Sequence, residues 1–207
     1  MAVWRFVDFS VERAQTLADL TGVERDLVAT IEMCDRTLSE YAKPTPEMIL
    51  IESLCAAAII RYGRTFSSGV RAGVPFGVIE KLDRDSQAAH KYFKDLRDKW
   101  AAHSVNSFEE NRVVAYLTPE EHGVKKVACV TVQQNRVSGL GGREINKLKE
   151  LCEKVLRSIS VIIEEEAETL LNYAQSLPVD ELYRQDEPEA FVPGQGSPSK
   201  SRRKLGK

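Results

Sequence analysis

The chain has little of what metal, disulfide or cofactor sites require. It contains four cysteines and three histidines in 207 residues, with no Cys-x-x-Cys pair and no histidines at metal-ligand spacing. We therefore expect no metal site, no disulfide framework and no cofactor. Each cysteine lies in an apolar pattern, which predicts buried free thiols in a reducing compartment. These residues are Cys34, Cys55, Cys129 and Cys152.

Long apolar runs and an excess of one charge are also absent. No run is long enough to span a bilayer, and the first residues lack the apolar core of a signal peptide, so we expect a cytoplasmic protein without membrane contact. A formal net charge of -2 argues against a protein that coats nucleic acids generally, although a local basic site remains compatible with it. The length favours a single domain.

The first half of the chain has helical periodicity. A short helix is expected over residues 11–19, ending near Gly22, and a longer amphipathic helix over 23–42. Proline at position 44 should end it. Thr45 then serves as the N-cap of a helix that contains residues 48–64. This helix is apolar nearly all round, which predicts a central position in the fold.

A third long helix is expected over 78–102, and a β-hairpin formed by 112–117 and 126–133 follows it. The last helix should cover 144–176. The sequence therefore predicts a mainly all-α fold, a four-helix bundle with a hairpin inserted before its last helix. This single domain covers 1–177, and the polar, basic segment 178–207 is expected to be a disordered tail.

The segment LRDKWAAHSVN (96–106) combines groups with complementary chemistry. Arg97 has a permanent charge and a planar fork of donors that suits a phosphate, whereas His103 can transfer a proton near neutral pH. Phosphodiester cleavage needs both functions, because charge develops on phosphoryl oxygens while protons move. On a regular helix the two side chains diverge. They converge only if the helix loosens near Ala102, if the arginine reaches round, or if a second subunit supplies one of them.

Alternative interpretations of these residues are structural. Arg97 could pair with a carboxylate, and His103 could be a satisfied core histidine, since it continues an inward-facing stripe of the third helix. Three details favour a functional site. Asp98 follows the arginine, His103 lies on the buried stripe, and a polar run that ends at Asn106 comes next.

The run R-D-K-W-A-A-H resembles the signature of HEPN domains, in which Arg, a polar residue and then His follow one another with four to six residues between Arg and His. Asp98 fits the polar position. The signature is also at the end of the third long helix of an expected bundle. The run I-R-Y-G-R-T-F (60–66) is similar to a segment of HEPN-like proteins of the abortive-infection type.

This resemblance implies a metal-independent endoribonuclease that acts as a homodimer, with two signatures facing each other across a cleft. Arg97 would hold the scissile phosphate, His103 would transfer protons, and Asp98 would orient one of them. A toxin or phage-defence effector, restrained by an antitoxin protein, is the implied context. The alternatives are a non-catalytic HEPN-like module that dimerises or binds a nucleotide or a partner, and a helical scaffold without a ligand.

Additional cations could contact RNA phosphates. Arg61, Arg64 and Lys94 are the candidates, together with the amide of Asn106. Arg61 lies on a helix too apolar to expose it freely, which indicates an anion or a partner. The alternative is a salt bridge to an acidic residue such as Glu52 or Asp95.

Overall fold

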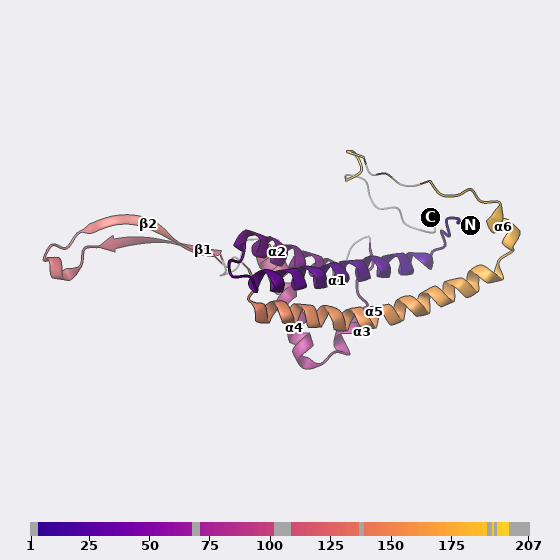
Figure 1. Cartoon of the computed structure of the whole chain (residues 1–207), viewed down its shortest axis with the longest axis horizontal. Helices are drawn as coiled ribbons and strands as arrows, with labels where there is room; N and C mark the ends of the chain where they lie inside the picture. The colour runs from indigo at the N-terminus through magenta and orange to yellow at the C-terminus, as the bar shows by residue number, and fades with distance from the viewer. Residues whose placement is uncertain are drawn as a thin grey trace.

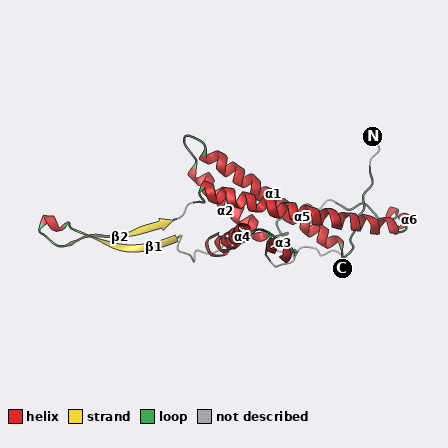
Figure 2. Ribbon diagram, turned by 90° about the horizontal axis from the view of Figure 1, so that it is seen from below, coloured by secondary structure: helices red, strands yellow, loops and turns green. Residues whose placement is uncertain are grey.

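The computed structural model describes residues 4–67, 71–101, 109–136, 139–189, 192 and 194–198. It is mainly helical, with one two-stranded antiparallel hairpin (Figures 1 and 2). The principal elements are α1 (Ala14–Tyr41), α2 (Met48–Arg64), α4 (Arg84–Leu96), β1 (Glu109–Leu117), β2 (Val127–Arg136) and α5 (Gly142–Ser176). The shorter elements are α3 (Phe76–Glu80), the π-helix η1 (Arg97–Ala101), the 3-10 turn η2 (Glu120–His122) and α6 (Val179–Tyr183). None of the described helices is both long and apolar enough to cross a membrane.

The core lies between α1, α2 and α5. Figure 1 shows α1 and α5 side by side and running in opposite directions, with α2 against α1. Fully buried side chains at helical spacing come from all three, among them Leu27, Ile59 and Val155. Phe93 and Leu96 of α4 complete this core, and Trp100 packs against it. The expected inward-facing stripe of the third helix is thus confirmed as far as Trp100.

Two expected helix boundaries were wrong. The predicted end near Gly22 does not occur, because α1 is continuous there. A Cβ at this glycine would lie 3.2 Å from the guanidinium of Arg71, so the glycine makes room for this arginine while the helix continues. The next helix begins at Met48 rather than at the proline after Thr45, and its N-cap Glu47 donates its N–H to Glu40 Oε1 (3.0 Å).

The third long helix is interrupted. Residues 81–83 separate α3 from α4, and Asp83 is the N-cap of α4, accepting the N–H of Ser86 at 2.9 Å. Because Lys154 and Ser86 hydrogen-bond its carboxylate, the pKa of Asp83 is well below its usual range. An aspartate is a favoured N-cap residue, but the prediction of one continuous helix used only the periodicity of apolar residues and therefore missed this helix start.

The expected central position of the second helix holds for its inner face only. Its inner face is buried at Ile51, Cys55 and Ile59, but Ile49 and Ile60 on the outer face are 67% and 41% exposed. Near-continuous apolar sequence therefore did not mean burial on all sides. The tail expected from 178 begins with α6, where Arg5 lies over the ring of Tyr183, and residues 199–207 lie outside the described residues.

The expected hairpin is confirmed. β1 and β2 pair over the whole of β1, from Glu109 opposite Arg136 to Leu117 opposite Val127, with a bulge between Tyr116 and Leu117. The turn region contains η2 and then Gly123, which has a positive φ of 70°. Figures 1 and 2 show the hairpin extending beyond one end of the helices.

The prediction of four buried thiols holds for three of them. Cys34, Cys55 and Cys152 are buried between α1, α2 and α5, whereas Cys129 on β2 is exposed. Burial raises the pKa of Cys34 to about 12 and also raises the pKa of Cys55 and Cys152. The buried thiols are therefore protonated and inert near neutral pH.

A thiol reagent such as dithionitrobenzoate should modify one cysteine rapidly in the native protein and four in denaturant. The rapid reaction should vanish in Cys129→Ser, because only this thiol is accessible among the four. Rapid modification of more than one cysteine in the native state would contradict the burial of the other three.

Candidate active site

Arg97 is the first residue of the π-helix that continues α4. The regular α-helix ends at Leu96, and the backbone widens over Arg97–Ala101 before Ala102 is reached. Such one-turn π segments are uncommon and frequently occur at functional sites. Loosening of the helix near Ala102 was one of three ways in which Arg97 and His103 could converge, and the π-helix widens the backbone from the arginine to Ala101.

The side chain of Arg97 crosses α2 at Gly63. A Cβ built on that glycine would lie 2.4 Å from Cγ of Arg97 and 2.9 Å from Cδ. Real side-chain atoms do not approach so closely, so only glycine lets the arginine follow this path. Sequence reasoning missed Gly63, although a glycine within an otherwise apolar helix is a signal of close packing.

Asp98 pairs with the guanidinium of Arg97. Nη1 of Arg97 donates to Oδ1 of Asp98 at 2.7 Å, and the two side chains are 35% and 45% exposed. One carboxylate leaves further donors of the planar fork to bind a ligand. The pair therefore provides an oriented cation at the surface of the bundle.

Of the other predicted site residues, Lys94 is nearest to Arg97 in the chain. It is exposed on the last turn of α4, one turn before the arginine. Such a position suits an additional phosphate contact. His103 and Asn106 lie outside the described residues.

Arg61 and Arg64 are engaged elsewhere. Both pair with Asp26 of α1, Arg61 at 3.1 Å and Arg64 at 3.3 Å, and Arg71 joins them at 2.9 Å. A salt bridge, the alternative interpretation of Arg61, is therefore present, but its partner is neither Glu52 nor Asp95. This cluster connects α1, α2 and the segment that follows α2.

The Asp26 carboxylate is 5% exposed, whereas the three arginines range from 20% to 54%. A buried carboxylate surrounded by guanidinium groups is mainly a structural feature, since its removal would leave the cations without their shared partner. Arg64, the most exposed, still presents part of its guanidinium to solvent. Sequence reasoning missed Asp26, whose signal was its position between Val23 and Leu27 on a buried face.

His90 has a structural environment. Its Nδ1 lies 2.8 Å from the hydroxyl of Tyr62, and its ring packs edge-on against Phe66 at 4.5 Å. Burial lowers the pKa of His90, so the ring is neutral near pH 7. This histidine therefore stabilises the contact between α2 and α4.

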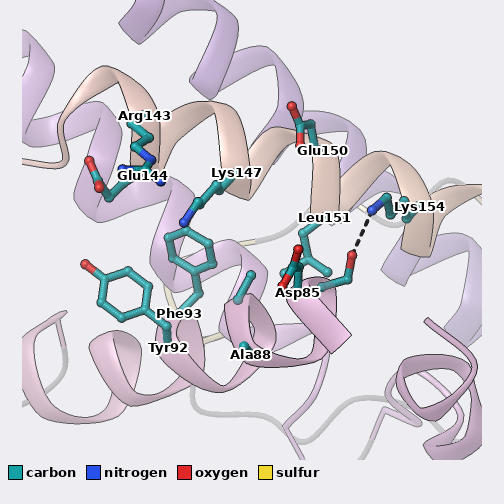
Figure 3. Close-up of a pocket in the computed structure, with 12 residues that line it drawn as sticks. Asp85, Ala88, Tyr92, Phe93, Arg143, Glu144, Lys147, Glu150, Leu151 and Lys154 are labelled. Carbon is teal, nitrogen blue, oxygen red and sulfur yellow. Dashed lines mark hydrogen bonds between the residues drawn. The ribbon is translucent and has the colours of Figure 1, made fainter. Parts of the chain in front are cut away.

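A cavity of about 640 Å³ lies between α4 and α5 (Figure 3). Its lining is of mixed charge, with Asp85, Glu144 and Glu150 beside Arg143, Lys147 and Lys154, and with Tyr92 on one wall. None of the predicted site residues lines it. Opposite charges alternate within the cavity, and Lys154 is held by Asp83 at 2.8 Å, so the lining does not favour a ligand of one charge.

No metal-binding group exists in the described part of the chain, where no three His, Cys, Asp or Glu side chains are suitably clustered. Comparison with known proteins adds no family: no family model, no curated protein and no solved structure matches the chain.

Replacing Gly63 by alanine should displace Arg97, because the new methyl group would overlap Cγ of the arginine. Overpacking of this kind costs about 1–3 kcal/mol, so a lower melting temperature is expected in a thermal scan. Gly77→Ala is the matched control, since a Cβ there meets nothing within 4 Å. Equal melting temperatures for Gly63→Ala and the wild type would contradict the close contact.

Replacing Asp26 by asparagine should lower the free energy of unfolding by about 2 kcal/mol or more. This loss of stability is smaller than the largest losses measured when one partner of a buried ion pair is removed, because Arg61 and Arg64 retain contact with water. Urea denaturation measures it. Asp35→Asn, on the same helix but at a half-exposed carboxylate paired with Lys149, should cost less than about 1 kcal/mol. Similar losses in both variants would argue against a structural role specific to the cluster.

Proposed function

We propose that this chain is a metal-independent endoribonuclease in which Arg97 and His103 act on the phosphodiester. The observation that carries the proposal is the π-helix at Arg97, because the side chain of this arginine crosses Gly63 and presents an oriented, partly exposed guanidinium. The HEPN-like signature that begins at this arginine places His103 six residues further along the chain. A toxin or phage-defence role is the context that the resemblance adds, with an antitoxin as a partner.

The proposed reaction is transfer of the phosphoryl group to the neighbouring ribose oxygen. The 2′-oxygen forms a bond to phosphorus, its proton passes to a base, and the bond to the 5′-oxygen breaks as that oxygen receives a proton. The products are a 2′,3′-cyclic phosphate and a 5′-hydroxyl. His103 would carry one of these protons, and Arg97 would stabilise the charge that develops on the phosphoryl oxygens. This route consumes no metal ion.

Asp98 would act as a positioning residue. Its hydrogen bond to Nη1 fixes one edge of the Arg97 guanidinium and leaves the remaining donors for two phosphate oxygens. Lys94, exposed one turn earlier, would attract an adjacent phosphate of the same strand.

A non-catalytic binding module is the second candidate. Arg61 and Arg64, two of the cations expected on RNA, pair with Asp26, which favours this alternative because fewer cations remain for a phosphate backbone. The two candidates differ in a direct observable: cleavage of RNA.

Purified protein incubated with mixed RNA in EDTA should cleave RNA and leave DNA intact, because DNA has no 2′-hydroxyl. Arg97→Ala and His103→Ala should each reduce the cleavage rate about a hundredfold or more. Arg97→Lys should recover little of the cleavage rate, since a lysine lacks the planar fork of donors of the arginine guanidinium. Lys99→Ala, which removes an exposed cation from the same π-helix, is the matched control and should retain activity.

Circular dichroism of each variant should match the wild type. Activity that survives both substitutions would contradict the mechanism, and so would a wild-type activity abolished by EDTA. A folded wild type that does not cleave RNA would favour the non-catalytic module.

A further inference from the structure

One face of the hairpin is apolar over the three paired rows nearest the turn. The strand register places Val113, Ala115 and Leu117 of β1 opposite residues of β2 whose side chains share their face. Those partners are Val132, Val130 and Val127, respectively. We call these six residues the valine face. Its valines and leucine are between 50% and 71% exposed, and no described residue covers them.

The other face of the hairpin is of mixed polarity. It carries, in paired order, Arg112 with Gln133, Val114 with Thr131, and Tyr116 with Cys129. An antiparallel sheet with one apolar and one partly polar face typically packs the apolar face against another layer. A lone two-stranded hairpin is marginally stable in water. The alternation thus indicates that something packs on the valine face.

We infer that the occupant is the valine face of a second copy of this chain. The valine face carries no charge, and the row next to it, Asn111 opposite Gln134, is also neutral. In a twofold contact, charges of one sign in these rows would lie close to their copies and repel, and these rows hold none; the first charged row of this face, Glu109 opposite Arg136, pairs opposite signs. The interface is therefore compatible with itself.

Charge also argues against an anionic occupant. Residues 109–136 contain four acidic and four basic side chains, which gives a net charge of zero with histidine neutral. These are Glu109, Glu110, Glu120 and Glu121 against Arg112, Lys125, Lys126 and Arg136. A nucleic acid or an anionic membrane would require a basic excess, which this element lacks.

Side-chain size selects how the two hairpins are oriented. In the middle row the small Ala115 lies beside the larger Val130. If both hairpin tips point the same way, β1 lies over β2 of the second copy, and each Ala115 faces a Val130. If the tips point in opposite directions, each Ala115 faces the other Ala115 and each Val130 faces the other Val130. The two alanines then leave a gap, while the two valines beside them are crowded. Close packing favours the first arrangement.

The same-direction arrangement brings both helical bundles to one end of the paired hairpins. The inference goes beyond the proposed function, because it rests on the hairpin alone and holds for a catalytic or a non-catalytic protein.

Light scattering tests the assembly. The wild type should have about twice the 23.2 kDa chain mass, and Val130→Lys, which places a charge in the middle of the valine face, should have the mass of one chain. Thr131→Lys is the matched control, because it alters the next residue on the opposite face and should remain dimeric. Circular dichroism checks that both variants keep their helices.

A wild type that is monomeric throughout the micromolar range would overturn the proposal. Dissociation of the dimer by Thr131→Lys to the same extent as by Val130→Lys would also overturn the proposal, since the loss of the dimer would then not depend on which face of the hairpin carries the charge. RNA cleavage is not used as a readout, so failure of the proposed function leaves this test intact.

Spin labels test the orientation. A label on Glu121→Cys at the tip, in a Cys129→Ser background, reports the distance between the two tips, while the three remaining cysteines are buried. Sheets pack about 10 Å apart, so same-direction hairpins should give a label separation below about 25 Å. Opposite directions would separate the tips by about 40 Å, because each lies roughly six residues from the middle row. A separation of that size would overturn the proposed arrangement.

Discussion

The burial of apolar seams where α1 and α5 run side by side is the constraint on which the other elements depend. These two helices supply most of the enclosed side chains, among them Leu27 and Val155, and α2 completes the layer with Ile59. Each fully buried aliphatic side chain contributes about 1.5–3 kcal/mol of hydrophobic free energy, whereas exposed pairs contribute far less. The position of α4, and hence of Arg97, follows from Phe93 and Leu96 reaching this core.

Two groups of cations have separate roles in the fold. Arg61, Arg64 and Arg71 surround the buried carboxylate of Asp26, so their first effect is to connect α1 with α2 and the segment after it. Arg97 pairs only with its neighbour Asp98 among the ion pairs found in the described residues, and it projects from a π-helix. This difference in partner and burial is why the proposed chemistry rests on Arg97 and not on the larger cluster.

The hairpin adds a surface that the core does not use. Each of its two strands pairs with the other along one edge, and the opposite edge of each strand has no partner strand among the described residues. The valine face is exposed to water in a single chain. β1 begins at Glu109, and η1 ends at Ala101. The hairpin of the proposed assembly and the arginine of the proposed chemistry are thus near each other in the chain, while the two proposals remain separately testable.

The sequence by itself determined the helical class, the hairpin with its alternation, and the buried stripe through Phe93, Leu96 and Trp100. These features follow from local periodicity, which depends on neighbouring residues alone. Only the tertiary structure decided that α1 continues through Gly22, that Gly63 admits Arg97, and that Asp26 collects three arginines from separate segments. Each of these depends on atoms far apart in sequence that meet in space. A pattern of residue types carries no information about which distant side chain will approach a given glycine or carboxylate, because that is set by how the helices pack.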